Sequence, residues 1–128
     1  GFGDFWEDRI DTYHAFLNVP DSTPRLLLSH QPDVAEMSDV SGRLSNGLPV
    51  KAPRVDLMLS GHLHGGQVKL PLVGAPRVPS RFGQKYLEGI VQGPAFPVLI
   101  SKGIGMSVLP IRWGAPPEIV ELTLRRKG

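Results

Sequence analysis

The stretch that decides the fold is Val55-Asp-Leu-Met-Leu-Ser60, which runs directly into Gly61-His-Leu-His-Gly-Gly-Gln67. The first part is a short apolar run, which is typical of a strand buried in a sheet. The second part places two histidines among three glycines, whose missing side chains let a substrate or an ion approach the backbone. Open α/β sheets bind ligands just past the carboxyl ends of their strands. The stretch therefore predicts a ligand site at the end of a buried strand.

A second apolar run ends in the same way. The segment Arg25-Leu-Leu-Leu-Ser-His30 predicts a short buried strand that closes with a histidine. Consecutive strands are commonly neighbours in a sheet, so we expect His30 to lie within reach of His62 and His64. In extended backbone, residues two apart point to the same side. His62 and His64 should therefore face one way, and Leu63 should face the core.

Three imidazoles that converge can bind one metal ion. Three histidines and a water form an open catalytic zinc site, which lowers the pKa of the bound water to about 7. We therefore predict that the metal ligands are His30, His62 and His64, and that the ion is Zn²⁺ or Mn²⁺. A single histidine at a strand end is more often hydrogen-bonded or exposed, so the prediction depends on all three lying together. His14 is expected to have a packing or surface role instead.

The first expected helix follows from the spacing of apolar residues near the start of the chain. Ile10, Tyr13, His14 and Leu17 recur at helical spacing and predict an amphipathic helix that ends near Asn18. The next helix follows from a capping signal.

Asp33 and Glu36 have the spacing of a capping box, which predicts a short helix that ends near Met37. Asp33 is accordingly expected to be a helix cap rather than a metal ligand. Ser38 to Arg54 is rich in glycine and proline, and we expect a long loop that is less ordered than the strands beside it. Its expected apolar anchors are Leu44, Leu48 and Val50. Further strands are expected at Gln67–Leu70, Val98–Ser101, Val108–Trp113 and Glu118–Leu124.

Composition limits the class of protein. The 128 residues fit one domain, residues 1–128, and the 15 glycines and 13 prolines favour short strands over long helices. Cysteine is absent, which excludes a disulfide framework and a cysteine nucleophile. A net charge of +2 without a dense basic patch argues against a nucleic-acid partner. No apolar run approaches the roughly 20 residues of a membrane span, and a cytoplasmic location is the default expectation.

The predicted elements form an α/β fold, with two strand–helix units followed by a strand-rich tail. Two short helices can cover only one face of such a sheet. The other face would stay apolar, and exposed apolar surface beyond a few hundred Å² normally finds a partner. We therefore expect the chain to form a homodimer with two-fold symmetry.

Several segments in this order resemble the carboxyl-terminal half of the calcineurin-like metallophosphoesterases. The likeness is to a bacterial branch with a Gly-His-Thr-His-Gly-Gly-Gln box, in which Leu63 stands here in place of the threonine. The resemblance implies half of a four-layer αββα sandwich, mostly β-strands with two short helices on one face, and metals at one end of the sheets. The segments are Leu27–Asp33, Asp56–Gln67, Ser101–Gly105 and Pro117–Ile119.

The resemblance also implies roles for single residues. His30 and His62 resemble ligands of one metal, and His64 resembles a ligand of the other. The first half of the family supplies an Asp-x-His, a Gly-Asp with the bridging carboxylate and a Gly-Asn-His; this sequence has no Asp-x-His and no Gly-Asn-His. Gly3-Asp4 is a Gly-Asp pair, but its neighbours match another segment, so we do not assign it the bridging role. The chain is thus expected to be a single truncated metallophosphoesterase domain.

On this basis we expect a metal-dependent phosphoesterase that hydrolyses small phosphodiesters or phosphotriesters. Two close cations without a bridging carboxylate would repel, which favours a single ion on the three histidines. A metal-bound hydroxide would attack phosphorus, and one ion suits diesters and triesters better than dianionic monoesters. Two alternatives remain: a non-catalytic metal-binding half-domain, and a subunit that another chain completes.

Overall fold

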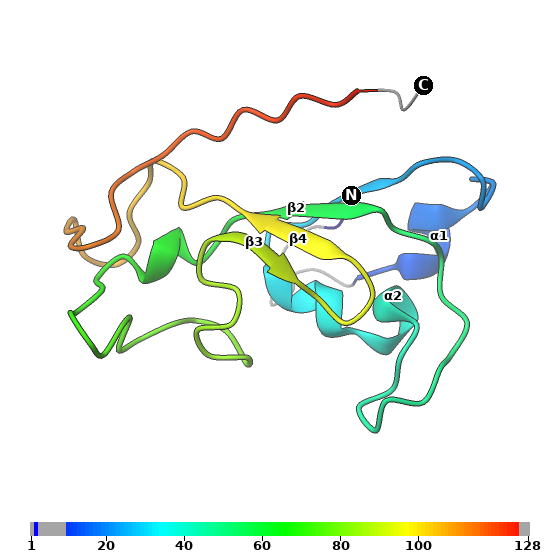
Figure 1. The fold of residues 1–128 in the computed structure, drawn as a ribbon, viewed down its shortest axis with the longest axis horizontal. Coiled ribbons are helices and arrows are strands. Elements are labelled where there is room, and N and C mark those ends of the chain that lie inside the picture. Colours follow the sequence, from blue (N-terminus) through cyan, green and yellow to red (C-terminus); the bar gives the residue numbers. More distant parts are fainter. Residues whose placement is uncertain (1, 3–9, 126–128) are drawn as a thin grey trace.

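The structure is a computed structural model that describes residue 2 and residues 10–125. Within these residues, one sheet contains four short strands, β1 (Leu26–Leu28), β2 (Leu57–Ser60), β3 (Gly89–Gln92) and β4 (Pro97–Ile100). The strands lie in the order β1-β2-β4-β3; β1, β2 and β4 are parallel, and β3 is antiparallel to β4. The carboxyl ends of the three parallel strands therefore meet at one edge of the sheet (Figure 1).

The helical segments are short. They are α1 (Thr12–Phe16), the 3₁₀ helix η1 (Pro32–Glu36), α2 (Ser38–Ser41) and the 3₁₀ turn η2 (His64–Gly66). η1 packs against β2 and β4, and α2 packs on η1, so that both lie on the same side of the sheet (Figure 1). No helix in the described part of the chain is long and apolar enough to cross a membrane.

The two faces of the sheet differ in burial. Leu27, Met58 and Val98 form one row across β1, β2 and β4, and all three are buried beneath the helical side. Burying such side chains contributes roughly 1.5–3 kcal/mol each, so this face forms the core. The next row, Leu28, Leu59, Leu99 and Ile90, faces the other way; Leu28 is 54% exposed and Ile90 is 74% exposed. The predicted α/β half-sandwich with helices on one face is confirmed.

Some predicted strands are wrong. Glu118–Leu124 is extended but pairs with no strand among the described residues, because an alternating pattern forms a strand only where a partner offers its backbone groups. Gln67–Leu70 and Val108–Trp113 make only isolated bridges, one of them between Val68 and Trp113. Conversely, β3 was not predicted, since Gly89-Ile-Val-Gln92 gains its conformation by pairing with β4.

The first helix is confirmed, but its predicted apolar face is wrong except at Ile10, which packs against the core. α1 has only five residues, and it turns Phe16 toward the core while Tyr13 and Leu17 are exposed. The Asp11 side chain caps the helix by accepting from the His14 backbone N–H at 3.0 Å, and it also contacts the His14 ring at 2.6 Å. His14 therefore has the expected surface role. Gly3-Asp4 lies outside the described residues.

The predicted capping box is wrong. Gln31 occupies the cap position of η1 and makes no side-chain cap bond. The buried Asp33 carboxylate instead accepts from Ser80 Oγ at 2.6 Å and from the Arg81 backbone N–H at 2.8 Å. Buried carboxylates need donors, and a neighbouring loop supplies better ones here than the helix does. Asp33 thus ties the segment near residue 80 to the core.

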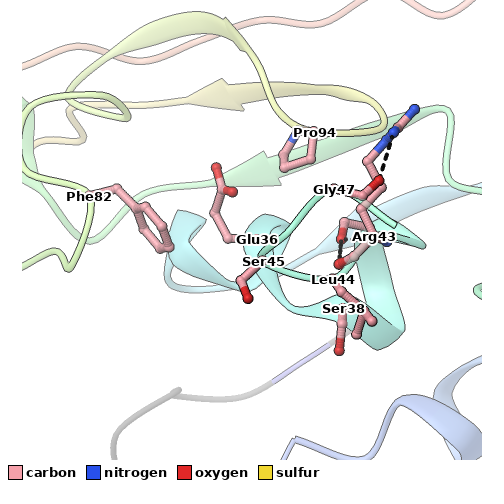
Figure 2. Close-up of a pocket in the computed structure, with 9 residues that line it drawn as sticks. Glu36, Ser38, Arg43, Leu44, Ser45, Gly47, Phe82 and Pro94 are labelled. Carbon is pink, nitrogen blue, oxygen red and sulfur yellow. Dashed lines mark hydrogen bonds between the residues drawn. The ribbon is translucent and has the colours of Figure 1, made fainter. Parts of the chain in front are cut away.

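The segment Ser38 to Arg54 contains more structure than a loop. Its first four residues form α2, which the buried side chain of Val40 anchors, whereas the expected anchors Leu44 and Leu48 are exposed. A small antiparallel bridge joins Arg43 to Pro49. A cavity of about 610 Å³ lies between this bridge, η1 and the segments at Phe82 and Pro94 (Figure 2). That the segment is less ordered than the strands stays a prediction.

Candidate metal centre

The parallel strands bring His30 and His62 together. His30 follows β1 and His62 follows β2, and the Gly61 N–H donates to the His30 carbonyl at 3.2 Å. The Ser60 hydroxyl donates to the same carbonyl at 3.0 Å. His62 Nδ1 lies 3.0 Å from His30 Nε2, and the ring centroids are 4.8 Å apart at an interplanar angle of 73°. The predicted adjacency of the two strand ends is confirmed.

The backbone after β2 turns sharply, so the expected extended conformation is wrong. His62 has a φ of +69°, His64 of +50° and Gln67 of +57°, all in the left-handed region. Such values are uncommon outside glycine and occur where surrounding structure over-determines them, often at functional sites. Leu63 is buried as predicted. The turn, rather than strand alternation, decides where the two imidazoles lie.

Two glycines allow this turn to pack closely. Gly65 and Gly66 have φ values of +64° and +78°. A Cβ on Gly65 would lie 2.7 Å from the Lys102 side chain, and one on Gly66 would lie 2.3 Å from Ala75 Cβ. These contacts are shorter than real side chains tolerate, so both positions need glycine for space as well as for conformation.

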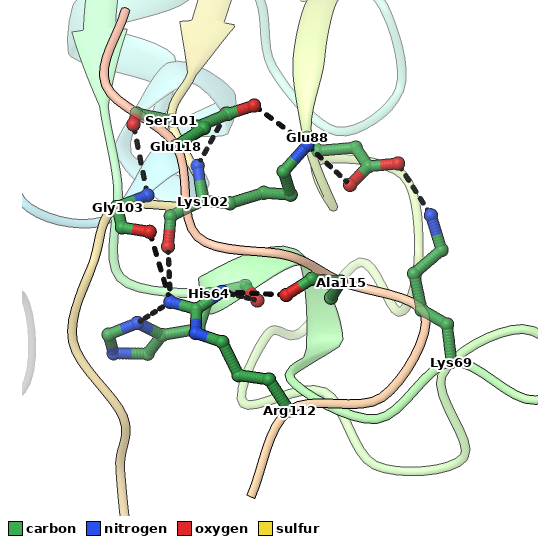
Figure 3. A network of polar contacts seen from close by, with 9 residues as sticks. All are labelled: His64, Lys69, Glu88, Ser101, Lys102, Gly103, Arg112, Ala115 and Glu118. Atoms are coloured by element: carbon green, nitrogen blue, oxygen red, sulfur yellow. Dashed lines mark hydrogen bonds and ion pairs between the residues drawn. The ribbon is translucent and has the colours of Figure 1, made fainter.

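His64 contacts a guanidinium group. Arg112 Nη2 lies 3.3 Å from His64 Nδ1, and Arg112 Nη1 lies 3.3 Å from the His64 carbonyl (Figure 3). Burial lowers the pKa of His64 below its usual 6.5, and the Arg112 charge lowers it further. The carbonyls of Lys102 and Gly105 oppose this shift. The imidazole is therefore held in its neutral form at pH 7, which is the form that binds metals.

Arg112 joins three segments around the histidine turn. It donates to the carbonyls of Gly103 at 3.1 Å, of Lys102 at 2.9 Å and of Ala115 at 3.0 Å (Figure 3). A guanidinium has five donors and no acceptor, so it suits a site where backbone carbonyls converge. The segment Gly103-Ile-Gly105 is fixed beside His64 by this residue.

An ion-pair network lies next to this cluster. Glu118 accepts from the Lys102 backbone N–H at 2.8 Å, and its carboxylate lies 2.7 Å from Lys102 Nζ. Glu88 lies 2.5 Å from Lys69 Nζ and 3.7 Å from Lys102 Nζ (Figure 3). The hydrogen bonds to Lys102 lower the pKa of Glu118 and keep it ionised at neutral pH. The carboxylates near the site are therefore neutralised by lysines rather than directed at the histidines.

A cavity of about 520 Å³ connects the three predicted ligands. His30, His62 and His64 all line it, together with Arg77 and several apolar side chains. Among the described residues, no three His, Asp or Glu side chains lie close enough together to hold one ion. The structure thus brings His30 and His62 into contact and places His64 on the wall of the same cavity.

The His30–His62 pair fits a divalent cation. Imidazole nitrogens bind Zn²⁺ at about 2.0–2.1 Å, so the nitrogens of two ligands on one tetrahedral ion lie about 3.3–3.4 Å apart. His62 Nδ1 and His30 Nε2 lie at a hydrogen-bond distance of 3.0 Å, so only a small separation of the two rings would bring them to that spacing. Two imidazoles and no carboxylate are also a donor set that suits Zn²⁺ and other transition metals better than Mg²⁺ or Ca²⁺.

The sequence interpretation missed the residues that support the site. Gln67 accepts from the Ser107 N–H at 2.7 Å and donates to the carbonyl of Leu109 at 2.9 Å, which fixes the loop that follows residue 103. Arg112 has no local spacing signal, because its partners lie up to 48 positions away in the chain. The resemblance included Lys102 and Glu118, but only the structure shows them as an ion pair.

Comparisons with known proteins find relatives that match most of the chain. The metallophosphoesterase YkuE of Bacillus subtilis is 38% identical over 100 residues, which cover 78% of this chain and 30% of YkuE. The phosphodiesterase YaeI of Escherichia coli is 32% identical over 124 residues, covering 97% of this chain and 40% of YaeI. The UDP-2,3-diacylglucosamine pyrophosphatase LpxG of Chlamydia muridarum is 30% identical over an alignment of 132 residues. The alignment covers 93% of this chain and 34% of LpxG.

The chain therefore belongs to the metallophosphoesterase family, as the resemblance implied. It spans 30% to 40% of the length of these three relatives and corresponds to a part of the family domain. No protein-family model matches the chain, and no solved structure matches it significantly.

Proposed function

We propose that this chain carries a metal-binding part of a phosphoesterase site that hydrolyses phosphodiesters or phosphotriesters. The observation that carries the proposal is the 3.0 Å approach of His62 Nδ1 to His30 Nε2 at the ends of two parallel strands. The relatives named metallophosphoesterase and phosphodiesterase support the reaction class. A divalent cation, Zn²⁺ or Mn²⁺, would supply a nucleophilic water near neutral pH and neutralise charge on the phosphoryl group.

The three histidines have distinct parts in this proposal. His30 and His62 would share one ion, and His64 would complete its ligand set after a change of side-chain rotamer. Burial, and after it the Arg112 charge, lowers the pKa of His64, and Arg112 also holds the histidine turn against the loop that follows β4. Arg77 lines the same cavity and would contact an anionic phosphoryl oxygen.

The rest of the catalytic set is proposed to come from outside the described residues. The cavity lining contains no Asp or Glu among the residues described. A second candidate function is therefore a subunit or half-domain that is completed by further protein. The row Leu28, Leu59, Leu99 and Ile90, in which Leu28 and Ile90 are exposed and the other two half-buried, favours association through the sheet face, and we propose a homodimer as its simplest form.

Hydrolysis of a chromogenic phosphodiester tests the proposal. The chain with added Zn²⁺ or Mn²⁺ should release product, chelation should abolish the release, and His62→Ala should remove most of it. His14→Ala is the matched control and should retain full turnover, because His14 pairs with Asp11 on the surface. Metal binding without turnover would support the incomplete half-domain instead, and a clean monomer in sedimentation would contradict the homodimer.

A further inference from the structure

The loops beside the histidine cavity expose an unusual amount of apolar surface. We define the apolar loops as residues 70–73 and 104–113. Val108 is 93% exposed and Trp113 is 65% exposed, although isolated tips of loops are usually polar. Exposed apolar patches of this kind mark interaction sites. The exposed side chains are Leu70, Leu72, Val73, Ile104, Met106, Val108, Leu109, Ile111 and Trp113.

The apolar loops form one surface at one end of the molecule. The Lys69 N–H donates to the Trp113 carbonyl at 2.7 Å, and the Trp113 N–H donates to the Gln67 carbonyl at 2.9 Å. Both loops lie beyond the carboxyl ends of the parallel strands, on the left in Figure 1. Val108 and Leu109 also line the histidine cavity, so the apolar surface borders the candidate metal centre.

The backbone holds these side chains in place. The turn 70–73 closes through reciprocal hydrogen bonds between Leu70 and Gly74, at 2.8 and 2.9 Å. Leu72 and Val108 have φ values of +66° and +65°, which are costly for such residues. The Gln67 side chain fixes the other loop at Ser107. The exposed apolar side chains therefore lie on turns whose backbone conformation is fixed by hydrogen bonds.

The sequence segments that contain the apolar loops have basic residues but no acidic ones. Residues 67–87 and 101–117 contain no Asp or Glu. Three of their lysines pair with glutamates outside these segments, whereas Arg77 makes no ion pair with the described residues and is exposed. The basic residues of the two segments are Lys69, Arg77, Arg81, Lys85, Lys102 and Arg112.

We propose that the apolar loops dock on an anionic lipid surface. Apolar tips insert at the boundary between headgroups and acyl chains, tryptophan favours that boundary, and the exposed Arg77, which lines the same cavity as Val108, attracts anionic headgroups. A second copy of the chain fits this surface less well, since a two-fold contact would bring like charges such as Arg77 face to face. This proposal does not depend on hydrolysis by the metal centre.

Sedimentation of the chain with vesicles tests the proposal. The chain should bind vesicles that contain phosphatidylglycerol more tightly than vesicles of phosphatidylcholine alone, and added salt should weaken the binding. Val108→Asp and Leu72→Asp should each lower the affinity for anionic vesicles by about tenfold. Arg77→Gln should lower that affinity by about fivefold and leave binding to neutral vesicles unchanged.

Leu48→Asp is the matched control, because Leu48 is an exposed aliphatic residue in the segment Ser38 to Arg54, outside both the apolar loops and the sheet face. It should bind vesicles like the unchanged chain, and all variants should keep the same circular dichroism spectrum. No binding to anionic vesicles would overturn the proposal, as would equal losses in Val108→Asp and Leu48→Asp. A dimer in light scattering that Val108→Asp dissociates would assign the loops to a second copy instead.

Discussion

The substitution Gly66→Ala should destabilise the chain for two separate reasons. Gly66 has a φ of +78°, and a left-handed conformation costs an alanine about 1–2 kcal/mol. A Cβ there would also lie 2.3 Å from Ala75 Cβ and 3.1 Å from Leu87 Cδ1. Forcing a methyl group into packed surroundings adds about 1–3 kcal/mol. The free energy of unfolding should therefore fall by about 2–5 kcal/mol.

Gly47→Ala separates the two contributions. Gly47 has a similar φ of +83°, but no atom lies within 4 Å of an added Cβ. Only the conformational cost applies there, so we expect a loss of about 1–2 kcal/mol. Urea denaturation followed by circular dichroism measures both variants. With a slope of about 1–3 kcal/mol per molar urea, the midpoint of Gly66→Ala should lie roughly 1 M lower than that of Gly47→Ala. Equal midpoints would refute the close packing of η2 against Ala75.

Three further predictions concern polar contacts. The pKa of His64 is lowered by burial and by Arg112, so Arg112→Gln should raise it toward 6.5 in an NMR titration; an unchanged pKa would argue against the contact in Figure 3. The pKa of Glu118 is lowered, first by its hydrogen bond from Lys102, so its stabilisation is present above pH 4.5 and is lost as the pH falls below that value. Glu118→Gln should remove this acid-dependent loss in denaturation curves, and an unaltered pH profile would count against the ion pair. Burial raises the pKa of Tyr86 above its usual 10.0, so the free energy of unfolding should decrease as the pH rises beyond 10. Tyr86→Phe should abolish that decrease. If the variant still lost stability above pH 10, the buried phenol would be contradicted.

Local signals in the sequence were sufficient to predict the parallel strands that position the site, although not β3. The apolar runs that became β1 and β2 are short, continuous and closed by polar residues, and the rule that consecutive strands are neighbours then placed His30 beside His62. The buried Leu63 was also predictable, although its direction follows from a turn rather than from strand alternation.

Contacts between distant segments could not be predicted in the same way. Asp33 has the sequence spacing of a helix cap, yet Ser80 and Arg81 supply its hydrogen-bond donors from a loop far along the chain. Arg112 reaches His64 across 48 positions and has no periodic neighbour that would mark it. Glu118–Leu124 alternates like a strand but has no strand partner among the described residues. The conformation or contacts of each of these residues depend on tertiary neighbours, which local sequence patterns do not reveal.

Metal content per chain tests the central claim most directly. Protein purified without chelator should bind about one divalent cation per chain at neutral pH when Zn²⁺ or Mn²⁺ is supplied, as three imidazoles and a water form one site. His30→Ala, His62→Ala and His64→Ala should each lose most of the metal, and His14→Ala should keep it. The unchanged chain should release the ion as the pH falls below about 6.5, because protons then compete with the metal and only neutral imidazole binds. If His62→Ala retained the metal while His14→Ala lost it, the candidate metal centre would be wrong.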